Sequence, residues 1–178
     1  LEASGVRIDG AQLDALPDLE PARYVASLRG EMNTRTGLLQ IFGSRIEGAP
    51  GAVSARGFFN TRSGTMDLQG SARVARLGDV SPLTGSAQGP FRVTSASSRA
   101  PFRISADIEG RGVASNDATL NELIGSSPRV SLVGAMSNGR FAIESGSVHA
   151  AGLRASMTGR IAESGAVTGR ANGVLSRP

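Results

Sequence analysis

Apolar and polar residues alternate along much of this chain with a period of two. The clearest run extends from Leu153 to Ile161, where apolar or small residues occupy every second position and residues such as Arg154, Ser156 and Arg160 lie between them. Successive side chains of a β-strand point to opposite faces of a sheet. This run therefore predicts a strand with one apolar face and one polar, basic face.

The same alternation recurs along the chain and predicts further strands. It is found in segments 6–8, 24–29, 37–48, 51–59, 66–74, 91–93, 102–109, 130–136 and 141–143. Asn138-Gly139, between the last two segments, is a pair favoured in two-residue hairpin turns. The pattern leaves open whether the other strands follow one another as hairpins or wind as a solenoid.

Leucine-bearing connectors interrupt the strands. They occupy segments 13–19, 77–89 and 116–125. In the third connector, Thr119 and Glu122 have the spacing of a capping box, and Gly125 lies where a C-cap glycine belongs. The large apolar residues on one face of this predicted helix are Leu120, Leu123 and Ile124. We expect one or two very short helices, which must dock their apolar residues on the sheet because so short a helix is unstable alone.

The order of connectors and strands predicts an all-β fold built as one elongated, repetitive sheet. A connector followed by strands occurs about three times, which gives approximate repeats 5–75, 76–115 and 116–175 within a single unit, 1–178. Units of this kind bury their apolar faces against their neighbours. Because the first residue is Leu1 and the alternation continues to Val174-Leu175, we expect this chain to be a segment of a longer protein.

Composition excludes several kinds of chemistry. The chain has no Cys, so it offers no disulfide, thiolate metal site or Cys nucleophile. All 19 basic residues are arginine, and the net charge is only +4. These arginines are scattered among the predicted strands, and few aromatic residues are present to stack on bases, so we do not expect nucleic acid as a partner.

No catalytic or cofactor-binding constellation is recognisable in the sequence. His149, the only histidine, has no carboxylate or second histidine at metal-ligand spacing. Asp107 and Glu109 share the polar face of one predicted strand and are interpreted as solvated charges. Gly110-Arg111-Gly112 is too short for a phosphate-binding loop and precedes no convincing helix. We therefore expect a protein that is not an enzyme and that uses no metal or cofactor.

The succession of connectors and Gly-spaced strands resembles the TamB/AsmA-like group of bacterial envelope proteins. The resemblance rests on LNELIG, the strand RVSLVGAM, an Asn-Gly turn and the segment GRFAIESGSVHAAGLRASMTGRI. The earlier connectors LDALPDL and LGDVSPLTG, each followed by strands, are similar. The resemblance covers most of the chain.

This resemblance implies a curved, taco-shaped sheet with an apolar inner groove. It also implies a parent protein that is anchored in the inner membrane and crosses the periplasm of a Gram-negative bacterium. Members of the group are implicated in moving phospholipid to the outer membrane. Through a C-terminal domain they partner an Omp85-family barrel, TamA, in outer-membrane protein assembly. Without that domain's signature or an anchor, this chain resembles an internal segment, and such a barrel would bind other parts of the protein.

Two functions follow from two possible arrangements of the apolar strand faces. If they line an open groove, the chain is expected to be a segment of a periplasm-spanning bridge that carries phospholipid between the inner and outer membranes or aids outer-membrane protein assembly. The alternative is a structural or adhesive β-solenoid with a filled core, which binds glycan or protein on its outer face. The candidate groove-lining residues, which would contact acyl chains, are Met66, Leu68, Val74, Phe91, Val93, Phe102, Ile104, Ile108, Val130, Leu132, Phe141, Ile143, Leu153, Met157 and Ile161.

Overall fold

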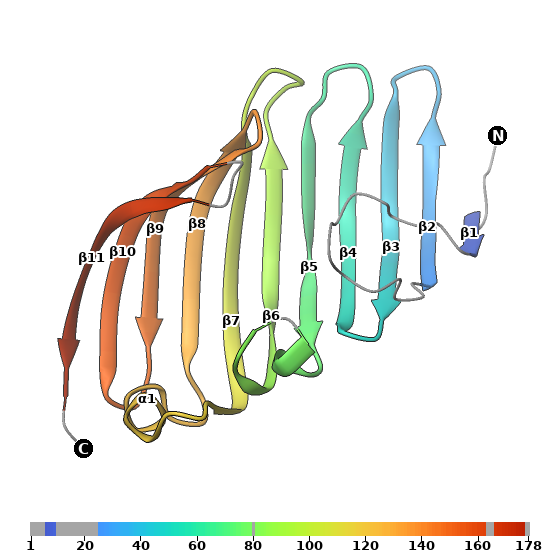
Figure 1. The fold of residues 1–178 in the computed structure, drawn as a ribbon. Coiled ribbons are helices and arrows are strands. Elements are labelled where there is room, and N and C mark those ends of the chain that lie inside the picture. Colours follow the sequence, from blue (N-terminus) through green and yellow to red (C-terminus); the bar gives the residue numbers. More distant parts are fainter. Residues whose placement is uncertain (1–5, 10–24, 80, 163–165, 177–178) are drawn as a thin grey trace.

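The protein folds as one open antiparallel sheet. The computed structural model describes residues 6–9, 25–79, 81–162 and 166–176. They contain eleven strands, and each strand pairs with its neighbours in the sequence (Figure 1). The first and last strands, β1 and β11, lie at opposite ends of the sheet. The all-β fold predicted from the sequence is confirmed.

The elements follow the predicted order of strands and connectors. The first five strands are β1 (Val6–Asp9), β2 (Val25–Asn33), β3 (Leu38–Gly48), β4 (Gly51–Asn60) and β5 (Met66–Val74). A 3-10 helix, η1 (Leu77–Asp79), then leads into β6 (Thr84–Ser95) and β7 (Phe102–Ala114). The predicted connector 77–89 is wrong for residues 84–89, because these belong to β6 and pair with β5 and β7. Helix α1 (Ala118–Ile124) leads into β8 (Arg129–Ser137), β9 (Arg140–His149), β10 (Leu153–Ile161) and β11 (Val167–Leu175).

The strands follow one another as hairpins and do not wind as a solenoid. Every pairing between consecutive strands is antiparallel. Asn138 and Gly139 form the turn between β8 and β9 with φ angles of 50° and 68°. Positive φ at both central residues is the requirement of a type I′ turn, which explains the preference for Asn-Gly at this position.

Helix α1 confirms the predicted connector helix but begins differently from the prediction. Its N-cap is Asp117, whose side chain accepts a hydrogen bond from the Leu120 backbone N–H at 3.1 Å. The predicted capping box of Thr119 and Glu122 is therefore wrong, because the Asp117 carboxylate caps the helix two residues earlier. Gly125 is the C-cap, as predicted. The first predicted connector, 13–19, lies outside the described residues.

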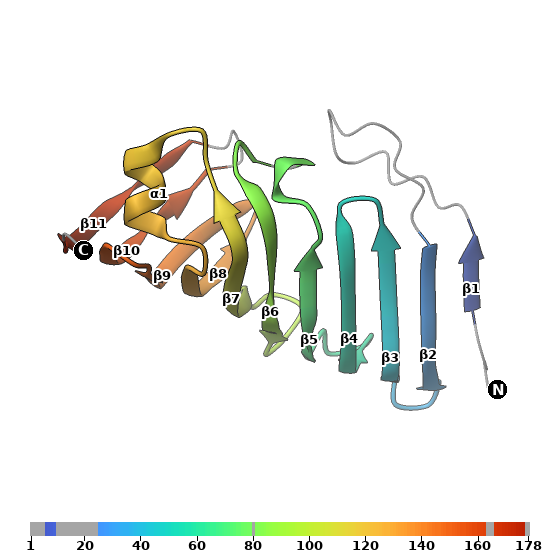
Figure 2. The ribbon, with the colours of Figure 1, turned by 90° about the horizontal axis from the view of Figure 1, so that it is seen from below.

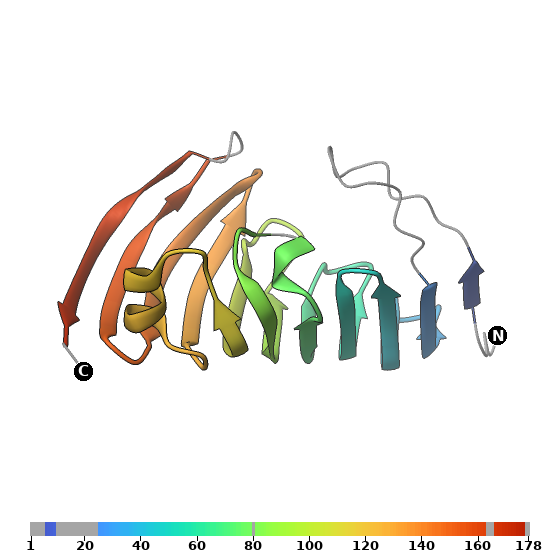
Figure 3. The same cartoon turned by 60° about the horizontal axis from the view of Figure 1, so that its bottom comes forward.

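The two described connectors, η1 and α1, both join strands along the same border of the sheet, where β5 and β7 end and β6 and β8 begin (Figures 1 and 3). The end of α1 contacts the turn between β9 and β10, where the Gly152 backbone N–H donates to the Leu123 carbonyl at 2.9 Å. Docking of the helix is only partial, since no α1 residue is buried and Leu120 is exposed. The prediction that the helix docks all of its apolar residues on the sheet is therefore only partly met.

The sheet forms a single layer and has almost no core. Figure 2, which views the molecule from below, shows the strands in one layer with the connectors to one side. Among the described residues, Val113 is the only apolar side chain that is buried. No second sheet packs on the first within the described residues. The filled core assumed in the β-solenoid alternative is therefore absent from this part of the chain.

Glycines allow neighbouring strands to approach closely in the middle of the sheet. A Cβ atom placed on Gly89 of β6 would lie 1.8 Å from the Asp107 carbonyl oxygen of β7. A Cβ atom on Gly70 of β5 would lie 1.9 Å from the Ser54 carbonyl oxygen of β4. Any side chain at these positions would push the strands apart, which is a known reason for glycine within a strand.

This close approach predicts that Gly89→Ala destabilises the sheet by about 1–3 kcal/mol, the usual range for overpacking. The free energy of unfolding would be measured in urea by circular dichroism. Gly43→Ala is the matched control, because a Cβ on this strand glycine meets nothing within 4 Å. Equal stability of the two variants would contradict the steric explanation.

Candidate functional site

The strand register gathers the apolar residues on one face of the sheet. Directly opposed residues of antiparallel strands point to the same side. Leu68 lies opposite Val93, and Val93 lies opposite Ile104. Ile104 lies opposite Gly134 of β8, and Gly134 lies opposite Ile143 of β9, so these residues form one row across five strands. We call the side of the sheet that carries this row the apolar face and the other side the polar face.

All of the predicted groove-lining residues lie on the apolar face. From β5 and β6 these are Met66, Leu68, Val74, Phe91 and Val93. From β7 and β8 they are Phe102, Ile104, Ile108, Val130 and Leu132. From β9 and β10 they are Phe141, Ile143, Leu153, Met157 and Ile161. The structure thus brings these candidates together as one continuous surface, and their contact with lipid stays a prediction.

Charged residues are kept off the apolar face. By the same register, the charged residues of β2–β11 point to the polar face. Two serines do lie on the apolar face, but their hydroxyls are used within the protein. The Ser44 Oγ donates to the Ala55 carbonyl at 3.2 Å, and the Ser95 Oγ donates to the Ser97 carbonyl at 2.9 Å. Neither hydroxyl therefore needs a hydrogen bond from whatever covers the face.

No second layer covers the apolar face within the described residues. The exposed fractions of Ile46, Phe102 and Met136 are 43%, 41% and 40%, and most other large apolar side chains of this face are half-buried between their neighbours on the sheet. At the α1 end of the strands, side-chain atoms of Val113 in β7 and of Pro128 just before β8 lie 2.6 and 3.0 Å from where a Cβ on Gly110 would be. A continuous apolar surface that no other layer covers marks a binding site more often than an ordinary protein surface.

Two β-bulges keep the apolar face in phase, and the sequence pattern did not reveal them. Phe42 is the extra residue of β3, where the pairing shifts against both β2 and β4. Because of this residue, Ile46 lies on the apolar face and Arg45 and Glu47 lie on the polar face. Glu144 has the same role in β9, where the pairing shifts against β8 and β10. A slip of one residue would exchange the two faces of a strand.

Ion pairs between strands lie on the polar face. Arg92 binds Asp67 of the neighbouring strand through two hydrogen bonds, from Nε at 2.9 Å and from Nη2 at 2.6 Å. These hydrogen bonds and the charge of Arg92 hold the pKa of the Asp67 carboxyl below its usual value. The bulge residue Glu144 pairs with Arg103 two strands away. Part of the charge on the polar face is therefore paired between strands.

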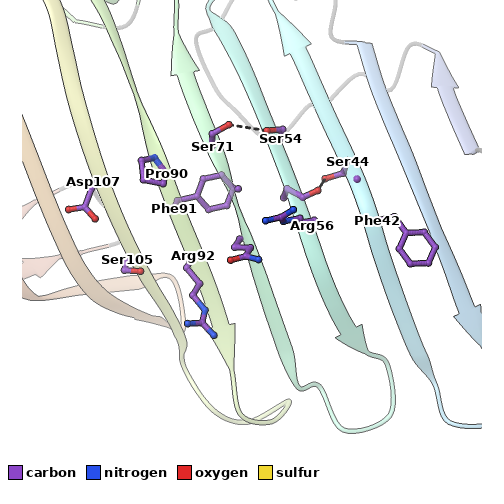
Figure 4. Close-up of a pocket in the computed structure, with 14 residues that line it drawn as sticks. Phe42, Ser44, Ser54, Arg56, Ser71, Pro90, Phe91, Arg92, Ser105 and Asp107 are labelled. Carbon is purple, nitrogen blue, oxygen red and sulfur yellow. Dashed lines mark hydrogen bonds between the residues drawn. The ribbon is translucent and has the colours of Figure 1, made fainter.

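Two neighbouring hollows of the sheet surface lie on the polar face. A hollow of about 570 Å³ crosses β3–β7 and is lined by polar-face residues that include Arg56, Arg92 and Asp107 (Figure 4). A second hollow of about 600 Å³ lies beside it and shares Phe42, Arg56 and Gln69. Phe42 is 46% exposed because its bulge directs the aromatic ring to the polar face, where Phe58, opposite Asp67, also lies. The sequence analysis missed both hollows.

Comparisons with known proteins add no family assignment. No protein-family model, curated protein or solved structure matches this chain. Among the residues that the structure describes, no cluster of three or more potential ligands could hold a metal ion. The same residues include no helix with the length and apolar character needed to span a bilayer. The resemblance to TamB/AsmA-like proteins stays a prediction.

The Arg92–Asp67 pair predicts a pH dependence of stability. Since its folded-state pKa is lowered, Asp67 stabilises the fold above its unfolded-state pKa of about 3.9, and this stabilisation is lost as the pH falls through the lower folded-state pKa. The urea midpoint of the wild type should exceed that of Asp67→Asn near neutral pH, and the difference should disappear in acid. The difference should be small because the pair is exposed. Asp107→Asn, at a carboxylate without an ion pair among the described residues, is the control.

Proposed function

We propose that the apolar face of this sheet holds the acyl chains of phospholipids, and that the chain is a segment of a bridge carrying phospholipid across the periplasm of a Gram-negative bacterium. The observation that carries the proposal is the continuity of this face over β2–β11 without a charged side chain. The envelope location, the inner-membrane anchor of the parent protein and a role in outer-membrane protein assembly belong to the same proposal through the family resemblance.

The dimensions of the apolar face suit an extended apolar ligand. Neighbouring strands lie about 4.8 Å apart, so β2–β11 extend for roughly 40 Å across the sheet. This length exceeds the roughly 30 Å of hydrocarbon in a bilayer. Each CH₂ group removed from water contributes about 0.8 kcal/mol, so a surface without specific polar contacts can retain an acyl chain.

The two side-chain hydroxyls on the described part of the apolar face are already hydrogen-bonded, and this supports the same proposal. An acyl chain cannot donate or accept a hydrogen bond, so a polar group that it covers loses its bonds to water and destabilises the complex. The hydroxyls of Ser44 and Ser95 are already bonded to backbone carbonyls. Covering the face with hydrocarbon therefore leaves these groups satisfied.

The proposal predicts that the protein, expressed in a bacterial periplasm, purifies with bound phospholipid. Native mass spectrometry and lipid extraction would detect it. Ile104→Asp and Leu153→Asp place a charge on the apolar face and should each remove most of the bound lipid. The matched controls are Ser105→Asp and Ser156→Asp, which place the same charge on the same two strands, β7 and β10, but on the polar face, and they should retain lipid.

Folding of each variant would be checked by circular dichroism. Folded Ile104→Asp and Leu153→Asp variants that keep their lipid would show that the apolar face is not the lipid site. A wild-type protein that is folded but free of lipid would contradict the proposal as a whole.

A second candidate function is supported by the hollow on the polar face. Phe42 offers an exposed aromatic ring there, and Arg56, Gln69 and Asp107 offer hydrogen-bond donors and acceptors, a combination that suits glycan (Figure 4). This candidate predicts that Phe42→Ala abolishes binding of N-acetylglucosamine oligomers in calorimetric titrations. Val53→Ala, on the apolar face, should leave it unchanged. No heat of binding to the wild type would exclude this glycan as the ligand.

A further inference from the structure

The turns from β2 to β3 and from β4 to β5 repeat one five-residue sequence. Residues 33–37 are NTRTG and residues 60–64 are NTRSG. In both turns the asparagine Oδ1 accepts hydrogen bonds from the backbone N–H groups two and three residues later. The φ angles of Gly37 and Gly64 are 75° and 72°. Asparagine and glycine thus account for the turn geometry, and the arginine between them needs another explanation.

A third turn, 96–101, lies along the same border of the sheet, opposite to the connectors η1 and α1 (Figure 1). The Thr61 backbone N–H donates to the Gly37 carbonyl and the Ser98 backbone N–H donates to the Ser63 carbonyl, each at 2.8 Å. The three turns therefore form one continuous edge, which we call the turn border. Segments 33–37, 60–65 and 96–101 contain no Asp or Glu. The exposed cations of these turns are Arg35, Arg62 and Arg99.

The guanidinium groups of the turn border can bind an anion. None of the three arginines forms an ion pair within the residues that the structure describes. The Arg62 Nη2 donates to the Thr34 carbonyl at 3.1 Å, which holds the group beside the neighbouring turn and leaves its other N–H donors for a ligand. The nearest strand carboxylates, Glu31 and Asp67, lie on the polar face, and Asp67 binds Arg92. Guanidinium groups bind phosphate through paired hydrogen bonds.

Large side chains of the apolar face lie next to the turn border. From β2 to β5, the directly opposed residues of this face nearest the border are Met32, Leu39, Phe59 and Met66. From β7 to β10 they are Phe102, Met136, Phe141 and Ile161. The turn border therefore combines an apolar surface with a row of cations, which is complementary to an amphiphile with an anionic headgroup.

The opposite border of the sheet lacks this combination. From β3 to β7, the residues of the apolar face nearest that border are mostly small, namely Gly48, Gly51, Val74, Ala87 and Gly110. The connector elements there carry carboxylates, at Asp79 in η1 and at Glu122 in α1. An anionic headgroup is therefore favoured at the turn border over the connector border.

We propose that the turn border binds the phosphate groups of phospholipids whose acyl chains lie on the apolar face. The inference rests on the proposed lipid binding and gives the bound lipid one orientation, with its headgroup at the turns and its chains directed towards the connectors. A nine-residue strand is about 30 Å long and one leaflet of a bilayer holds roughly 15 Å of hydrocarbon, so the chains fit along the strands. The turns recur every two strands, roughly 10 Å apart, so each arginine can bind its own headgroup.

Lipid preference tests the role of the arginines. Delipidated protein would be offered equal amounts of dioleoyl phosphatidylglycerol and dioleoylglycerol, which share their acyl chains but differ in the phosphate, and bound lipid would be counted by native mass spectrometry. We expect the wild type to prefer the phospholipid about tenfold, the lower end for hydrogen bonds to a charged group, because the arginines are exposed. The triple variant Arg35→Gln/Arg62→Gln/Arg99→Gln should lose this preference and still bind dioleoylglycerol.

The matched control for this experiment is Arg73→Gln/Arg154→Gln/Arg170→Gln, which changes the net charge equally but on the polar face, and which should keep the preference. A wild type that binds both lipids equally, a turn variant that keeps the preference, or a control that loses it would overturn the inference and leave lipid binding in place. A wild type that binds neither lipid would overturn the proposed function as well.

The orientation of the lipid can be tested with all three arginines in place. The protein has no cysteine, so a single introduced cysteine carries a fluorophore at one position. Dioleoyl phosphatidylethanolamine with a nitroxide on its headgroup should quench a fluorophore on Ser98→Cys, in the turn border, more strongly than one on Leu120→Cys, in α1 at the opposite border. Equal quenching, or stronger quenching at Leu120→Cys, would overturn the orientation.

Discussion

The structure depends on one constraint, the register that keeps every strand of the sheet in phase. The side-chain period of a strand is two, so a slip by one residue would turn its charges towards the apolar face. At two places in the described strands, the pairing shifts against both neighbouring strands and this error is avoided. The bulges at Phe42 and Glu144 each insert one residue and restore the phase. They also place the Phe42 ring and the Glu144 carboxylate on the polar face. There the ring lines a hollow and the carboxylate pairs with Arg103.

A single-layer sheet without a core must be stabilised differently from a sandwich. Its residues are held by the hydrogen-bonded ladders and by side chains of neighbouring strands on the same face, such as Leu68 and Val93. Burial contributes little, since Val113 is the only buried apolar side chain among the described residues. The apolar surface that a sandwich would bury between two sheets remains available for a ligand. A ligand that covers these side chains in the folded state would therefore also stabilise the fold.

The sequence predicted the strands and the membership of the apolar face because both follow from a local period of two. The turn at Asn138-Gly139 was also predictable from local sequence, because the requirement for positive φ applies to these two residues alone. The bulges were not predictable, because Phe42 and Glu144 become extra residues only relative to the strands on both sides. The N-cap at Asp117 was missed because Thr119 and Glu122 have the spacing of a capping box, whereas Asp117 has no Glu or Gln three residues later. The hollows depend on the shape of several strands together, which no single segment encodes.

The hairpin order of the strands has a consequence for how the sheet assembles and comes apart. Each strand pairs only with the strands before and after it in the chain, so no long-range closure must precede the next step. The sheet can therefore grow strand by strand in the order in which the chain is delivered. Loss of structure should begin at the two ends, where a strand has one neighbour instead of two. Under tension applied between β1 and β11, which lie at opposite ends of the sheet, strands would detach one at a time in a series of small steps.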